Sequence, residues 1–119
     1  MDIENLTELL DSSEFMNKDV VLGKVELGEC TLGESAKLTN RSQLLKTYRI
    51  RRSHLKGPET SKYRELALAT DEFCKNLELL SEDDEIFGFM LAVNGLEYFI
   101  IYIDNPKMII GCLPFQPWP

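Results

Sequence analysis

Two apolar runs flank an Asn-Gly pair in the last third of the chain. Residues 86–93 and 96–103 lie on either side of Asn94-Gly95, a dipeptide that favours a two-residue turn because both positions accept a positive φ. The pattern predicts a β-hairpin over these residues. A second turn at 104–107 leads into another apolar run at 108–113. The segment is therefore predicted to form a three-stranded antiparallel meander.

Both faces of the predicted hairpin are apolar. The two-residue turn pairs Val93 with Leu96, Leu91 with Tyr98, Phe89 with Ile100 and Phe87 with Tyr102, all on one face. The second face carries the residues that we take as candidate partner-binding residues: Met90, Phe99, Ile101 and Ile103. A sheet with one face in water alternates apolar and polar residues, so each side of this sheet needs a cover. The second face exceeds what one short helix buries, and we expect a partner surface to cover it.

Apolar residues three and four positions apart predict two helices. Residues 60–80 place such residues on one side of a long helix, and residues 3–15 do so over a shorter stretch. The acidic run at 81–85 would oppose the dipole of a helix C-terminus and is predicted to be a loop. The long helix can cover one face of the meander, and the short helix part of the other. Phe73 and Phe89 are predicted to lie in the core.

The middle of the chain has weaker patterns. Alternation within residues 20–33 predicts a strand, with its glycines at bends or bulges. Residues 34–46 are ambiguous apart from a short helix at 42–46. Apolar and basic residues alternate at 47–52, which predicts an edge strand with most of its arginines in water.

These elements define an α+β fold. We expect residues 1–119 to form a single domain, which matches the usual size of one domain. Its antiparallel sheet, with the C-terminal three-stranded meander, should pack against one long helix and a short N-terminal helix. The order of helix, strands, helix and three antiparallel strands resembles, in outline, the roadblock family of small dimeric scaffolds and the acidic secretion chaperones. This resemblance assigns a function to no residue.

Charge is arranged in blocks along the chain. The 119 residues carry a net charge of −7, but residues 37–64 hold nine basic residues and one acidic residue between acidic flanks. The basic block either neutralises its flanks within the folded domain or forms an exposed site for an anion. The candidate anion-binding residues, in the basic segment 46–56, are Arg49, Arg51, Arg52 and Lys56. The negative net charge makes nucleic acid an unfavourable partner, because phosphate binding is mainly electrostatic.

Residues that carry chemistry are few. His54 is the single histidine, and the three cysteines, Cys30, Cys74 and Cys112, are too far apart for the usual close pairs of a zinc site. We therefore expect no catalytic residue, no metal site and no cofactor. Residues 1–20 lack the basic and apolar regions of a signal peptide, and no apolar run is long enough to span a bilayer. A cytoplasmic protein with reduced thiols is the expectation, with no membrane partner.

Three classes of function remain open. The first is a non-enzymatic protein–protein interaction domain of the adaptor, chaperone, immunity or inhibitor type. It would be acidic and dimeric, bound to another protein or to itself as a homodimer, since exposed apolar surface usually marks a contact site. The second is a nucleic-acid or phosphate-binding module that uses the 46–56 segment. The third is a small-molecule-binding domain with a pocket between helix 60–80 and the sheet.

Overall fold

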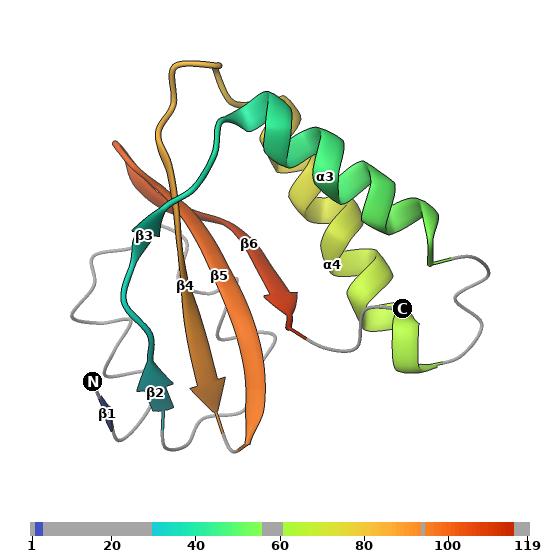
Figure 1. Cartoon of the computed structure of the whole chain (residues 1–119), viewed down its shortest axis with the longest axis vertical. Coiled ribbons are helices and arrows are strands. Elements are labelled where there is room, and N and C mark those ends of the chain that lie inside the picture. Colours follow the sequence, from blue (N-terminus) through green and yellow to red (C-terminus); the bar gives the residue numbers. More distant parts are fainter. Residues whose placement is uncertain (1, 4–29, 56–60, 94, 116–119) are drawn as a thin grey trace.

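Two helices and one antiparallel sheet form the described part of the chain (Figure 1). The structure is a computed structural model that describes residues 2–3, 30–55, 61–93 and 95–115. The strands are β1 (Asp2–Ile3), β2 (Cys30–Leu32), β3 (Ala36–Lys37), β4 (Ile86–Val93), β5 (Leu96–Asp104) and β6 (Lys107–Pro114), and the helices are α3 (Arg41–Ser53) and α4 (Ser61–Glu78). The sheet order is β1-β2-β4-β5-β6, and β3 pairs with β4 on the same edge as β2. The predicted α+β class is confirmed.

The C-terminal meander has the predicted register. Val93 pairs with Leu96, and the pairing continues down the hairpin to Phe87 and Tyr102. Gly95 has a φ of +80°, a conformation that side chains disfavour and glycine adopts freely. β6 continues the sheet on the far side of β5, with a register shift between Ile101 and Tyr102. Local turn chemistry was therefore sufficient to specify all three strands.

The N-terminal predictions fall mostly outside the described residues. Residues 4–15 of the predicted helix and residues 20–29 of the predicted strand lie there. Ile3, which the pattern assigned to the helix, instead belongs to β1 and pairs with Cys30. Cys30–Leu32 form β2, in agreement with the predicted strand.

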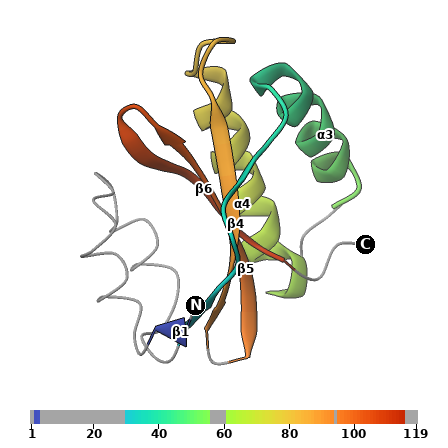
Figure 2. The same cartoon turned by 60° about the vertical axis from the view of Figure 1, so that its left-hand side comes forward.

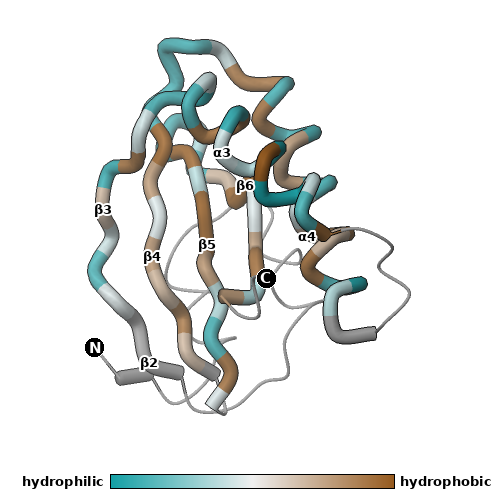
Figure 3. The backbone as a smooth tube through the Cα atoms, turned by 45° about the vertical axis from the view of Figure 1, so that its right-hand side comes forward, coloured by the Kyte–Doolittle hydropathy of each residue, from teal (hydrophilic) through white to brown (hydrophobic). Residues whose placement is uncertain are grey.

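Both helices lie on the same side of the sheet (Figure 2). The long helix was predicted over 60–80 and is confirmed as α4, which packs on β6, while α3 packs on α4. Figure 3 shows hydrophobic residues along β4 and β5. One core cluster joins the helices to the sheet: Leu44, Leu45, Tyr48, Ala69, Phe73, Leu77, Ile86, Ile101, Ile103, Ile110 and Leu113. Neither described helix is long and apolar enough to cross a membrane.

A helix replaces the predicted edge strand at 47–52. The alternation of Tyr48 and Ile50 with arginines suggested a strand, but Ile50 is exposed and only Tyr48 is buried. The buried residues of α3 follow a helical spacing instead, with Leu44 four positions before Tyr48. The Asn40 side chain also accepts a hydrogen bond from the backbone N–H of Gln43, which caps the helix N-terminus. The strand prediction was wrong because burial and capping outweigh a short alternation.

The helices cover the sheet face that was predicted to bind a partner. Ile101 is fully buried and Ile103 is buried beside it, both in the core cluster beneath the helices. Phe99 packs partly buried against the same cluster, with its ring over Gly88, and Met90 is half-buried. The expectation that this face exceeds the cover provided by the chain was wrong for Ile101 and Ile103. Two helices pack in one layer there, where the sequence had indicated one short helix.

The opposite face of the meander is buried as well. Its buried side chains include the predicted core residue Phe89, together with Leu91, Tyr98, Ile100, Tyr102, Ile109 and Cys112. Phe87 and Tyr102 stack with ring centroids 5.6 Å apart. Phe73 and Phe89, the two predicted core residues, are therefore both confirmed, on opposite faces of the sheet.

Candidate functional site

Three of the four candidate anion-binding residues lie on α3, where they contact groups of the same domain. Arg49 forms an ion pair with Glu78 of α4, and Arg52 Nε lies 2.8 Å from Asp71 Oδ1. The Arg51 guanidinium stacks over the Tyr48 ring, 5.1 Å from its centroid. Lys56 lies outside the described residues. These contacts favour the interpretation in which the basic block neutralises its acidic flanks.

Arg41 holds the C-terminus of α4. Its Nε donates to the backbone carbonyl of Leu77 at 2.7 Å and its Nη2 to that of Glu78 at 3.3 Å. These carbonyls belong to the last turn of the helix, where intrahelical partners run out. The same guanidinium pairs with Glu82 in the acidic loop at 3.3 Å. The loop predicted at 81–85 is confirmed as a connection without helix or strand. Through the ion pair of Glu82 with Arg41, this loop after α4 also contacts α3.

Removing Arg41 is expected to destabilise the domain more than removing Arg49. Arg41→Ala removes both of these hydrogen bonds, although the Leu77 carbonyl keeps its bond from the Leu80 N–H, and we expect a loss of about 1–2 kcal/mol. Arg49→Ala breaks an exposed ion pair and should cost less than about 1 kcal/mol. Urea denaturation of both variants measures the difference. Equal losses of unfolding free energy in the two variants would contradict this prediction. They would show that the hydrogen bonds of Arg41 to the helix terminus contribute no more stability than an exposed ion pair.

The histidine and the cysteines take up ordinary structural positions. His54 is exposed at the C-cap of α3, and Cys112 is a buried cysteine of β6. Cys74 is a half-buried free thiol in α4. Burial raises its pKa above the ordinary value, and the positive charge of Arg49 opposes this only in part. Burial therefore favours the neutral thiol of Cys74 over its thiolate.

Groups of acidic, histidine and cysteine side chains do not converge on a metal-binding geometry among the described residues. The buried side-chain nitrogen and oxygen atoms of this part of the chain all have hydrogen-bond partners. The described interior thus offers no polar cluster waiting for a ligand. A candidate site has to be sought on the surface.

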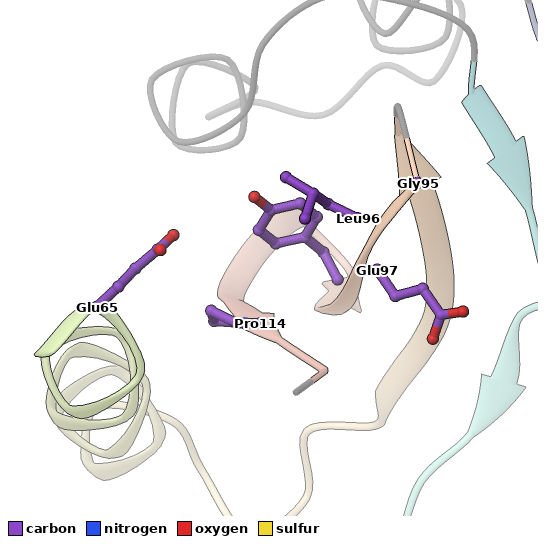
Figure 4. A pocket seen from close by; sticks show the side chains of 6 residues that line it. Glu65, Gly95, Leu96, Glu97 and Pro114 are labelled. Carbon is purple, nitrogen blue, oxygen red and sulfur yellow. The ribbon is translucent and has the colours of Figure 1, made fainter. Parts of the chain in front are cut away.

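A surface pocket of about 450 Å³ lies between α4 and the β4–β5 hairpin end. It is lined by residues of α4, β5 and β6 and the turn before β5: Glu65, Gly95, Leu96, Glu97, Tyr98 and Pro114. In Figure 4 the Glu65 side chain extends from α4 toward Leu96, with Pro114 below them and Glu97 turned to the other side of β5. The pocket thus combines a carboxylate wall with an apolar floor. A pocket between the long helix and the sheet was part of the third class of function considered above.

One exposed apolar side chain lines this pocket, and two more lie close in the chain to lining residues. Leu96 lines it and is 61% exposed, and Phe115, which is 44% exposed, directly follows the lining residue Pro114. The backbone N–H of Phe115 donates to the Glu97 carbonyl at 3.0 Å, which holds this segment beside β5. Leu68 is 60% exposed and lies three residues after Glu65, on the same side of α4.

Sequence reasoning did not single out these residues. Leu68 differs from the core residues of α4 because it lies five positions before Phe73, about 140° away around the helix. This angular offset could have indicated from the sequence alone that Leu68 is exposed. The sequence could not predict where Leu68 lies relative to Leu96 and Phe115, because this depends on how α4 lies across the sheet.

The comparisons with known proteins add no relative. A scan against protein-family models finds no match, and searches of the curated proteins and of the solved structures find none either. The outline resemblance to roadblock scaffolds and secretion chaperones has no support from these comparisons. Function has to be argued from the surface of the domain.

Proposed function

We propose that this chain is a non-enzymatic protein-interaction domain of the adaptor, chaperone, immunity or inhibitor type. The observation that carries the proposal is the exposed Leu96 in the pocket, with two further exposed apolar residues close in the chain to lining residues: Leu68, one helical turn from Glu65, and Phe115, next to Pro114. Apolar side chains grouped on a surface favour contact with another protein, because burying them releases about 25 cal/mol per Å². We call these three apolar residues and the pocket the α4–β5 surface.

The partner is proposed to be a different protein. The burial of Ile101 and Ile103 in the core argues against a homodimer that uses these two side chains. The net charge of −7 also opposes contact between two copies. Binding of nucleic acid through α3 is disfavoured because Arg49 and Arg52 already pair with carboxylates of α4. A cytoplasmic location fits the free thiol of Cys74.

A capture experiment with matched variants tests the proposal. The immobilised chain is exposed to cell extract as the wild type, as the double variant Leu96→Ser and Phe115→Ser, and as Leu79→Ser. Leu79 is the matched control, because it is 79% exposed and lies at the other end of α4. Polypeptides retained by the wild type and by Leu79→Ser should be lost from the double variant. If the double variant retains every polypeptide that the wild type retains, the proposal is wrong.

A further inference from the structure

We propose that the α4–β5 surface binds a basic segment of its partner, with one arginine side chain in the pocket and apolar residues on either side of it. This inference rests on the proposed function, and it adds the chemistry of the ligand. Charge, shape and the apolar surroundings of the pocket each support it.

The charged residues that line the pocket are both acidic. Glu65 of α4 extends toward the pocket while the Glu97 side chain on β5 is turned away from it (Figure 4), and basic side chains are lacking among the described lining residues. Arg64 precedes Glu65 but points about 100° away around the helix axis. The Glu65 side chain is exposed and extends toward the pocket (Figure 4). A cation that enters the pocket therefore meets a carboxylate without displacing a basic side chain of a described lining residue.

The remaining walls suit the stem of an arginine. Leu96 and Pro114 present apolar surface, and the Tyr98 side chain, which is mostly buried, adds part of an aromatic wall. Arginine buries its aliphatic stem against such surface while its charged head stays partly in water. Its planar guanidinium pairs with a carboxylate through two parallel hydrogen bonds, which lysine cannot form. The volume of about 450 Å³ holds one long side chain with parts of its neighbours.

The exposed apolar residues define the neighbours of that arginine. Leu68 lies one helical turn from Glu65 on α4, and Phe115 follows the lining residue Pro114 in the chain, and both side chains are exposed. A bound segment would place apolar side chains on these two residues. The net charge of −7 would also attract a basic segment over long range and increase its association rate.

A random twelve-residue peptide library, displayed on phage and selected on the full chain, tests the ligand class. We expect enrichment of peptides in which arginine is flanked by leucine, isoleucine or aromatic residues, and loss of that enrichment on the Leu96→Ser variant. Enrichment that depends on Leu96 but lacks basic residues would overturn this inference and leave the proposed function standing. The absence of any enrichment that depends on Leu96 would count against both.

Defined peptides measure the charge contribution. A fluorescein-labelled peptide that alternates arginine and leucine is titrated by anisotropy, beside a copy with glutamine for each arginine and a copy with serine for each leucine. Glu65→Gln should weaken binding of the first peptide about tenfold, the effect of one lost charge-assisted hydrogen bond. Asp83→Asn removes the same charge from an exposed position of the acidic loop, and it should change the affinity less than twofold.

The same titration contains the results that would overturn the inference. Equal losses for Glu65→Gln and Asp83→Asn would reduce the binding to a general effect of net charge. Equal affinity for the arginine and glutamine peptides would remove the basic ligand class. Chemical-shift changes of wild-type backbone amides on binding supply a readout without mutation. They should concentrate near residues 65–68, 96–98 and 115, and changes centred on α3 would place the basic peptide elsewhere.

Discussion

Ile101→Asp is expected to unfold the domain. Ile101 is 0% exposed and packs in the cluster that joins the helices to the sheet. The substitution removes the apolar contacts of a core isoleucine, which are worth about 2–5 kcal/mol. It also places a carboxylate where no cation is paired with it in the core cluster, at a further cost of several kcal/mol. Because domains of this kind are stable by only about 5–15 kcal/mol, the unfolded state should dominate at neutral pH.

Circular dichroism and size-exclusion chromatography measure this outcome. Leu79→Asp is the control, since Leu79 is 79% exposed and its replacement should leave the fold intact. The alternative outcome is a folded Ile101→Asp protein with half the mass of the wild type in solution. That result would restore the view of Ile101 as a residue of a dimer interface.

Phe73→Ala should produce the second largest loss, about 3–5 kcal/mol. Phe73 is 0% exposed and lies at the centre of the domain, where its ring meets the Tyr48 ring edge-on with centroids 4.9 Å apart. On the sheet side its ring lies directly over Gly111, where even a Cβ would come within 2.6 Å of Phe73 Cδ1. Since Gly111 has no side chain, it cannot fill the space that the ring would leave. The cost should therefore lie near the upper end of the range.

Urea denaturation of Phe73→Ala measures this cost, with Leu68→Ala as a control from the exposed side of the same helix. Leu68→Ala should change stability by no more than about 0.5 kcal/mol, as surface substitutions usually do. If Phe73→Ala lost less than about 1 kcal/mol, the cluster between α4 and β6 would not be the main core.

The meander could be read from the sequence because local chemistry determines it. Asn94-Gly95 sets a two-residue turn, and the turn fixes every pair from Val93 and Leu96 down to Phe87 and Tyr102. The helix α4 was readable for a similar reason, because the spacing from Leu66 to Leu77 marks a single face. Both features need information only from residues close together in the chain.

Features that depend on distant residues were missed. Arg49 and Arg52 pair with Glu78 and Asp71 of α4. The alternating pattern at 47–52 could not indicate these partners, because they are distant in the chain. The sequence also left open which face of the meander the helices cover, since both faces are apolar. Packing with β6 places α4 over Ile101 and Ile103. The α4–β5 surface was hidden for the same reason, because it is assembled from elements about thirty residues apart.

The pairing of α4 with β6 has a consequence during synthesis on the ribosome. α4 ends at Glu78 and β6 begins at Lys107, so the helix is complete well before its principal partner strand exists. At translation rates of about 5–20 residues per second, these 29 residues (107 minus 78) take on the order of seconds to add. Through that interval Phe73 and Leu77 lack β6 as a cover. We expect general chaperones that bind apolar helices to recognise the nascent chain in this interval and to release it once β6 has emerged.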